Sequence, residues 1–216
     1  MKVLIACEFS GVVRDEFLKL GHDAVSCDLL PSESDRGRHI LGDVRDVIKS
    51  ERWHLMIAHP PCTFLSNAGN RHFKNNPERC KKREEALSFA MSLYNADIPR
   101  VCIENPQGYL NSHFRRPDQI IHPWMFGDHE MKRTCLWLRG LPKLYYSVQF
   151  PQKPEPYYIR TTDGHRMHFT DASHCSQGLT RWQTRARTFH GIAEAMAVQW
   201  GSAGSQYFYE KYAGVV

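Results

Sequence analysis

The sequence predicts an α/β protein with a mostly parallel sheet and helices on both faces of that sheet. Two observations lead to this fold class. Short apolar runs alternate with segments of helical period along most of the chain, and several of these runs end on an acidic or polar residue. The chain has 216 residues, of which 42% are hydrophobic and 24% charged, so we expect one globular domain with a sizeable core.

The alternation begins at the start of the chain. An apolar run at residues 2–7 is followed by an amphipathic segment that reaches Leu20, and Gly21 stands where a helix of this length would end. Further strands are expected at residues 23–28, 40–41 and 54–58. None of these runs reaches the ~18 apolar residues of a membrane span, and the first is too short for an export signal.

The second half of the chain continues the pattern. Asn76 and Pro77 suit an N-cap followed by proline at the first helical position. Helical spacing then places six residues on one face: Ala86, Leu87, Phe89, Ala90, Leu93 and Tyr94. Strands are expected at residues 100–104 and 135–138, and a closing helix carries Ala193, Met196, Ala197 and Trp200 on one face. Residues 143–183 lack any such period, which predicts a small insertion in a main domain formed by residues 1–142 and 184–216.

Positive charge is concentrated in one part of the chain. The net charge is +5, but residues 132–187 carry ten Lys or Arg against three acids, so this segment alone is +7 and the rest is −2. Such a surplus favours a surface that faces nucleic acid, although an ordinary solvated face is the alternative. The seven cysteines form no Cys-x-x-Cys pair, and Cys7, Cys27 and Cys102 lie in apolar runs, which favours reduced thiols in a cytoplasm.

Polar side chains follow several of the predicted strands, and ligands of open α/β sheets bind beyond the carboxyl ends of strands. Asp28 could accept hydrogen bonds from the ribose hydroxyls of a nucleoside cofactor, and Asp43 could accept one from an adenine amino group. Phe9 could stack on the adenine, and Gly11 would let the backbone approach closely. Acids after strands are also common helix caps, so that alternative stays open.

A sharper pair is formed by Cys62, in the stretch MIAHPPCTFLS, and Glu104, at the end of RVCIE. The two prolines before Cys62 remove backbone donors and mark the end of a strand, which argues against a merely buried thiol. A thiolate is a strong nucleophile. Burial at the end of its strand is expected to raise the pKa of Glu104 and suit it to sharing a proton, while a cap or a salt bridge is the alternative.

These motifs resemble the DNA (cytosine-5) methyltransferases, and in compactness the chain is most similar to their short phage-type members. The resemblance rests first on the motif PPC, which a serine follows after four residues, and on the later motif ENP. It rests also on FSG as the opening cofactor loop, MKRTCLWLRG as a basic segment that enters a strand, and RTFHGIAEAMA as the closing helix. It implies the Rossmann-like class I S-adenosylmethionine-dependent methyltransferase fold. Residues 1–142 and 184–216 would form the catalytic domain, and 143–183 a target-recognition-like insertion.

The resemblance also implies a mechanism, in which Cys62 adds to carbon 6 of a cytosine flipped out of duplex DNA. Glu104 would hydrogen-bond ring nitrogen 3 and the amine, and Arg133 the carbonyl oxygen. The cofactor, S-adenosylmethionine, would be held by Phe9, Ser10, Gly11, Asp28, Asp43 and Pro60. DNA would be contacted by Asn105, Arg181, Gln183, Arg185 and Arg187. We expect a monomer in the cytoplasm of a bacterial host or a phage-infected cell, without metal or membrane.

Several positions depart from the family pattern. Val12 and Val13 stand in place of a second glycine pair, Thr63 in place of glutamine and Pro106 in place of valine. Residues 183–187, QTRAR, also match the family's Gln-x-Arg-x-Arg pattern. Arg133 is preferred as the base contact because a strand follows it.

Three other functions stay open: methylation of a free pyrimidine nucleotide, amino-methylation of DNA bases, and DNA binding by a degenerate enzyme. His165, His168, His174 and Cys175 could bind zinc, but their irregular spacing disfavours this.

Overall fold

The computed structural model describes residues 1–148, 152–156, 158–159, 163–167 and 185–201. Its centre is a seven-stranded sheet with the strand order β3-β2-β1-β4-β5-β7-β6. The strands are β1 (Lys2–Ala6), β2 (Asp23–Asp28), β3 (Arg38–Leu41), β4 (Leu55–Ala58), β5 (Arg100–Pro106), β6 (Gln119–Ile121) and β7 (Thr134–Arg139). The predicted strands are confirmed. β6 was not expected, because three residues are too few for a period to show.

Strands β1 to β5 are parallel, and β7 is antiparallel to both of its neighbours. The chain moves outward from β1 through β2 to β3 and then returns to β4 on the other side of β1, so the order reverses between β1 and β4. This is the Rossmann-like class I methyltransferase fold that was predicted. In such sheets a ligand crevice forms at the reversal, outside the carboxyl ends of the strands. The fold alone does not fix the reaction.

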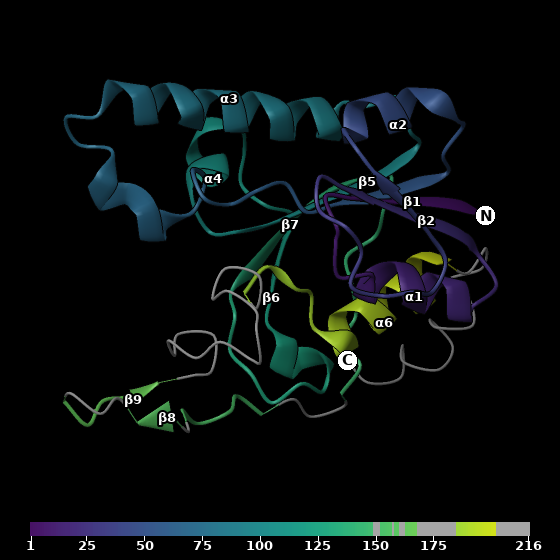
Figure 1. Cartoon of the computed structure of the whole chain (residues 1–216). Helices are drawn as coiled ribbons and strands as arrows, with labels where there is room; N and C mark the ends of the chain where they lie inside the picture. The colour runs from purple at the N-terminus through teal and green to yellow at the C-terminus, as the bar shows by residue number, and fades with distance from the viewer. Residues whose placement is uncertain (149–151, 157, 160–162, 168–184, 202–216) are drawn as a thin grey trace.

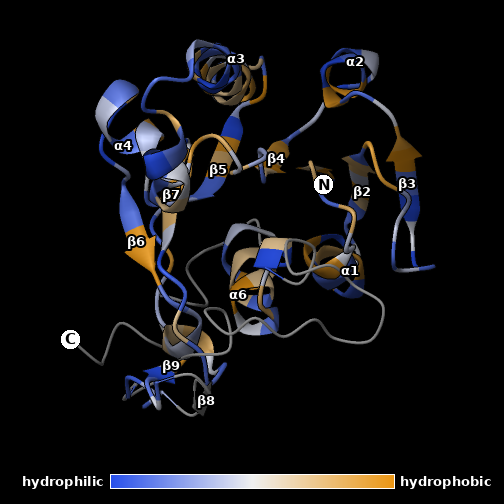
Figure 2. Cartoon of the chain, turned by 60° about the vertical axis from the view of Figure 1, so that its left-hand side comes forward, coloured by the Kyte–Doolittle hydropathy of each residue, from blue (hydrophilic) through white to orange (hydrophobic). Residues whose placement is uncertain are grey.

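Helices cover both faces of the sheet, so the domain has three layers (Figure 1). One face carries α2 (Val44–Ser50), α3 (Pro77–Tyr94) and α4 (Tyr109–His113), and the other carries α1 (Val12–Lys19) and α6 (His190–Gly201). On α2 and α3, Figure 2 shows orange hydrophobic positions turned towards the sheet and blue positions turned outward. Two 3-10 helices lie in the connections between these elements: η1 (Asn67–His72) between β4 and α3, and η2 (Pro123–Phe126) between β6 and β7.

The central strands are apolar throughout because both of their faces are covered. Successive residues of β1 alternate between the two cores: Val3 and Ile5 pack under α1 and α6, whereas Leu4 and Ala6 pack under α2 and α3. Burial of such side chains is the main stabilising contribution of the fold.

Helix ends follow the local chemistry that the sequence predicts. Asn76 caps α3, because its side-chain oxygen accepts a hydrogen bond from Arg79 N at 2.9 Å, and Pro77 is the first helical residue. Gly21, at φ 78°, follows the end of α1 as expected. Helix α6 packs against α1, the helix that begins directly after residues 9–11.

The segment 143–183 is described only in part. It contains a short hairpin of β8 (Tyr158–Ile159) and β9 (Arg166–Met167), which lies away from the main sheet (Figure 1). The division into a main domain and a recognition insertion therefore stays a prediction. Among the residues that the structure describes, no helix combines the length and the apolar character of a membrane span.

Candidate active site

The loop after β4 presents Cys62 at the surface. His59 N donates to Ala6 O at 2.9 Å, which continues the pairing with β1 to the start of the loop. The amides of Leu65 and Ser66 then donate to Cys62 O at 3.0 and 2.9 Å, so a tight turn follows the cysteine. Cys62 itself is exposed. The Pro-Pro pair thus ends the strand and carries a thiol out of the core, as predicted.

The loop after β5 lies beside the Cys62 loop because β4 and β5 are neighbours in the sheet. Asn105 Nδ2 donates to Pro60 O at 2.7 Å, and Ser66 and Gly108 form a β-bridge. Asn105 is only 1% exposed. Its predicted direct contact with nucleic acid does not fit this burial, and its observed contact instead fixes the Pro-Pro segment.

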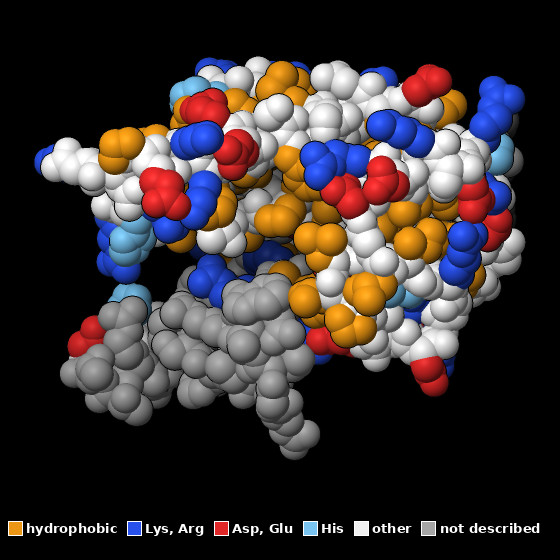
Figure 3. All heavy atoms as spheres, turned by 45° about the horizontal axis from the view of Figure 1, so that its top comes forward, with side chains coloured by type: hydrophobic (Ala, Val, Ile, Leu, Met, Phe, Trp, Pro, Cys, Tyr) orange, Lys and Arg blue, Asp and Glu red, His pale blue; other side chains and the backbone are white. Residues whose placement is uncertain are grey.

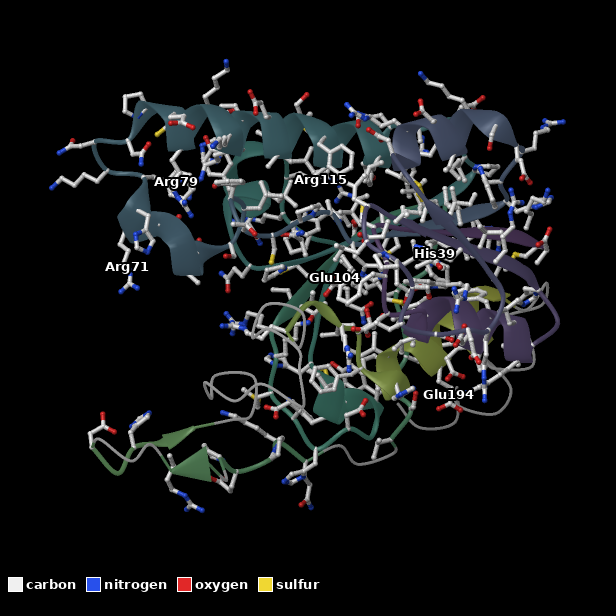
Figure 4. The ribbon with its side chains drawn as sticks, viewed as in Figure 1. His39, Arg71, Arg79, Glu104, Arg115 and Glu194 are labelled. Carbon is white, nitrogen blue, oxygen red and sulfur yellow. The ribbon has the colours of Figure 1, made fainter. Side chains whose placement is uncertain are left out.

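Glu104 lies near the carboxyl end of β5, at the edge of the sheet where β1, β2, β4 and β5 end (Figure 4). We call this edge the open edge. His59 Nδ1 lies 3.3 Å from its Oε2, and the two side chains are 8% and 14% exposed. Burial raises the pKa of Glu104, but hydrogen bonds from His59 and Thr134 and the charges of Lys132 and His59 outweigh it, so the pKa is lowered. The expected rise of this pKa was wrong, since these partners stabilise the carboxylate.

Lys132 brings a positive charge to both Glu104 and Cys62. Although Cys62 is exposed as a residue, protein atoms around its sulfur partly desolvate the thiol, and this desolvation and the charge of Glu104 raise its pKa. The charges of Lys132 and Arg185 partly oppose this rise. Lys132 Nζ also donates to the carbonyls of Arg185 and Arg187, at 2.9 and 3.3 Å. The site therefore joins segments from the loop after β4, the end of β5, the entry to β7 and the approach to α6.

The two candidate base-contacting segments lie differently. Arg133 is exposed and donates to Gln107 Oε1 at 2.7 Å, beside the loop after β5. Arg185 is also exposed, and its charge reaches Cys62. Arg187 forms an ion pair with Glu33 at 2.7 Å, so it ties this segment to the loop after β2. Arg181 and Gln183 lie outside the described residues.

No role was predicted for three residues of the site: His59, Lys132 and Thr134. Each lies directly beside a motif that was recognised. His59 precedes the Pro-Pro pair, and Lys132 and Thr134 flank Arg133. The residue types of His59 and Lys132 could have indicated a role in the site, because an imidazole next to a nucleophile can transfer protons and an ammonium group can supply positive charge.

The loop after β1 has the geometry of a functional turn. Cys7 has φ 58°, which non-glycine residues adopt rarely and which is concentrated at functional sites. Glu8 is buried and accepts hydrogen bonds from Val13 N at 2.7 Å and Arg14 N at 3.3 Å, so it caps α1. Burial is the main cause of its raised pKa.

The remaining residues of the predicted cofactor set, Phe9, Ser10, Gly11 and Pro60, are all buried. Gly11, at φ 75°, has no room for a Cβ, since Arg14 Nη2 would lie 2.7 Å away. Ser10 Oγ lies 3.4 Å from Glu8 Oε1, and Pro60 is held through its carbonyl by Asn105. Phe9 is 7% exposed, so its ring offers little surface to a ligand in this conformation. Their roles in cofactor binding stay predictions.

The two acids predicted to bind the cofactor have different surroundings. Asp28 is half-buried at the end of β2, where burial raises its pKa and where it receives a hydrogen bond from Leu30 N at 2.9 Å. Asp43 is the N-cap of α2, and hydrogen bonds from the Arg45 side chain and amide lower its pKa to about 2. Asp28 fits a ribose-binding acid. Asp43 fits the helix-cap alternative, because its carboxylate is already engaged.

The zinc alternative gains no support from the described part of the chain. His165 is exposed, whereas His168, His174 and Cys175 lie outside the described residues. No group of three metal-ligating side chains occurs among the residues that are described.

No protein-family model and no curated protein matches this chain. Two solved structures are similar to part of this chain. One is described as a DNA modification methyltransferase encoded within a prophage (Escherichia coli), with 13% identity and a TM-score of 0.45, covering 64% of this chain and 46% of that one. The other is the Entamoeba histolytica methyltransferase EhMeth, with 15% identity and a TM-score of 0.41, covering 68% of this chain and 57% of that one. The matched region thus spans about half the length of those structures.

Proposed function

We propose that this protein transfers a methyl group from S-adenosylmethionine to carbon 5 of cytosine in DNA, through a covalent adduct of Cys62. The observation that carries the proposal is the meeting of Cys62 and Glu104 at the ends of neighbouring strands, with Lys132 within electrostatic reach of both. A nucleophile, a carboxylate and a cation around one open edge suit a ring that is attacked at carbon 6 and held at nitrogen 3 and the amine.

The residues divide the work as follows. The Cys62 sulfur bonds to carbon 6, and Lys132 and Arg185 favour its thiolate form. Glu104 accepts from the exocyclic amine and faces ring nitrogen 3. Asp28, Pro60 and the loop of residues 9–11 would hold S-adenosylmethionine, which when bound would supply the methyl group. Arg185 and Arg133 are the two candidates for the carbonyl oxygen, and Arg185 is favoured because its charge reaches Cys62.

DNA rather than a free nucleotide is supported by a second basic surface, formed by residues 67–83. These residues carry six cations and one acid, Glu78, although the sequence outside residues 132–187 is −2 overall. The cations are Arg71, Lys74, Arg79, Lys81, Lys82 and Arg83. The surface projects on one side of the open edge, with Arg71 and Arg79 on it and Glu104 at the inner end (Figure 4). Figure 3 shows a hollow on this face with Lys and Arg side chains inside it.

The proposal is tested by methyl transfer from labelled S-adenosylmethionine to cytosine-containing duplex DNA, with deoxycytidine monophosphate as a parallel substrate. Products are resolved as nucleosides. We expect 5-methyldeoxycytidine in the duplex, and Cys62→Ala should lower the rate by about 10³-fold or more. Cys80→Ala is the matched control, because Cys80 is also an exposed thiol but lies on α3.

Each alternative has its own outcome. Label in the free nucleotide alone indicates a nucleotide methyltransferase. Label in an amino group that survives Cys62→Ala indicates amino-methylation. Duplex binding without any transfer indicates a degenerate DNA-binding protein. Each of these results would contradict the proposed reaction.

A further inference from the structure

The imidazole of His59 is buried beside the carboxylate of Glu104. Its Nδ1 contacts the Glu104 carboxylate at 3.3 Å, and its side chain is 8% exposed. Its Nε2 is buried and has no hydrogen-bond partner among the described residues. A buried polar atom left without a partner costs free energy, so packing alone does not explain a histidine at this position.

Charged groups face His59 from several elements. Glu104 faces it from β5, Glu8 from the loop after β1 and Asp28 from the end of β2, and the charge of His59 lowers the pKa values of all three against the effect of burial. Three carboxylates attract a positive charge on the ring. Lys132, from the entry to β7, faces Glu104 as well, and Cys62 follows His59 on the same loop.

The proposed reaction needs a proton at ring nitrogen 3 of cytosine when Cys62 adds to carbon 6. Glu104 faces that nitrogen in the proposed site, but its lowered pKa means that it is a carboxylate near neutral pH. A carboxylate has no proton to give. A second group beside it has to supply one.

We propose that His59 is a positioning residue that holds the transferable proton of a His59–Glu104 pair and passes it through Glu104 to ring nitrogen 3. This inference rests on the proposed function and adds to it the source of the proton. Glu104 carries the same charge before and after the step, so it conveys the proton and His59 supplies it.

The step balances in atoms and electrons. As the Cys62 sulfur bonds to carbon 6, the C5–C6 π pair becomes a C4–C5 double bond, and the N3–C4 π pair takes the proton at nitrogen 3. The proton moves from Nδ1 of His59 to Glu104 and from Glu104 to nitrogen 3. After methyl transfer, carbon 5 loses its proton to water, the C6–S bond breaks, and nitrogen 3 returns its proton to the pair.

The test is the pH dependence of single-turnover methyl transfer to duplex DNA, in wild type and in His59→Asn. An asparagine amide can donate a hydrogen bond from near the Nδ1 position but cannot transfer a proton. In wild type a rising pH favours the Cys62 thiolate and disfavours the supply of a proton to nitrogen 3, so we expect a nearly level rate around neutral pH. His59→Asn should be about 10²-fold slower at neutral pH, with a rate that rises about tenfold per pH unit over the same range. Parallel profiles with similar rates would overturn the role of His59.

A second measurement does not depend on turnover. Imidazole ¹⁵N shifts of His59 show which ring nitrogen carries a proton, and we expect a protonated Nδ1 at the pH of the activity assay because it contacts the Glu104 carboxylate. An unprotonated Nδ1 at that pH would contradict the proposal even if the variants fail to fold. Wild type that methylates no cytosine contradicts the proposed function, whereas active wild type with parallel profiles contradicts only the role of His59.

Discussion

At the scale of residues, the pKa values of two neighbouring acids in the site, Cys62 and Glu104, are shifted in opposite directions. Burial raises the pKa of both Cys62 and Glu104. For Glu104 the hydrogen bonds from His59 and Thr134 reverse that effect, whereas Cys62 has the carboxylate of Glu104 as an unfavourable neighbour. The resulting pair is a resting thiol beside a stable carboxylate. Lys132 and Arg185 are then the groups that make the thiolate accessible.

This arrangement predicts how charge changes affect the Cys62 thiol. We expect the alkylation rate of Cys62 by iodoacetamide, followed by mass spectrometry, to reach half its maximum at a pH above the ordinary value of about 9. Glu104→Gln removes a negative neighbour and should lower that midpoint by about half a pH unit to one pH unit. Lys132→Gln should raise it by a similar amount.

Arg133→Gln is the matched control for this series, because Arg133 carries the same charge one residue away but bonds to Gln107. It should leave the alkylation midpoint of Cys62 unchanged. An alkylation midpoint that shifts in Arg133→Gln but not in Lys132→Gln would show that Arg133, and not Lys132, is the cation beside Cys62.

At the scale of elements, the site depends on two loops that are joined backbone to backbone. Tyr109 N donates to Leu65 O at 2.7 Å, Asn67 N donates to Gln107 O at 3.3 Å, and Ser66 bridges Gly108. The loop that carries Cys62 and the loop that follows Glu104 are thereby held as one unit. Side chains alone would not keep the sulfur and the carboxylate at a fixed separation with the accuracy that catalysis requires.

Gly108 is the residue that makes this close approach possible. A Cβ at this position would lie 1.9 Å from Leu65 O, so Gly108→Ala must displace one of the two backbones. We expect a loss of about 1–3 kcal/mol in the free energy of unfolding, measured by urea denaturation, and a larger loss of methyl-transfer activity than of S-adenosylmethionine binding.

Gly42→Ala provides the comparison, since a Cβ at Gly42 meets nothing within 4 Å. That variant should change stability by less than about 0.5 kcal/mol and leave the activity intact. Equal stability of the two variants would mean that the loops are not packed as tightly as their backbone contacts indicate.

At the scale of the whole molecule, the predictable parts are those that local patterns determine. Apolar runs and their ends located Cys62 and Glu104, and the topology then placed them at one edge. The identity of the cation beside Glu104 could not be predicted, because neighbouring residues on an extended segment point to opposite sides and a one-residue difference exchanges Lys132 for Arg133. The role of Asp43 could not be predicted for a different reason, because an acid at the end of a strand can either bind a ligand or cap the next helix. In the structure the side chain and the amide of Arg45 bind its carboxylate.

The basic surface of residues 67–83 was not predicted, because the negative net charge of the sequence outside residues 132–187 conceals its local positive surplus. Contacts that only the fold creates hold this surface in place. Arg83 lies 3.1 Å from the ring centroid of Phe73 and 4.6 Å from that of Tyr109, and its Nε donates to Phe64 O at 3.0 Å. These contacts fasten η1 to α3 and α4. The surface is therefore held in place by the fold, and in the proposed function it would contact the phosphate backbone of the duplex.

Duplex binding should then depend on cations that lie far from the recognition insertion. Arg71→Gln/Lys74→Gln removes two exposed charges from this surface. Phosphate contacts release counterions, so we expect the slope of log K against log salt to decrease in magnitude by about 2 for both charges together. The measurement is fluorescence anisotropy with labelled duplex over a range of salt concentrations. Lys49→Gln/Arg52→Gln makes the same charge change at exposed positions of α2 and the segment after it, at the far end of the molecule from η1, and should leave the slope unchanged (Figure 1). Equal slopes for both double variants would place the DNA path away from residues 67–83 and leave the insertion as the main basic surface.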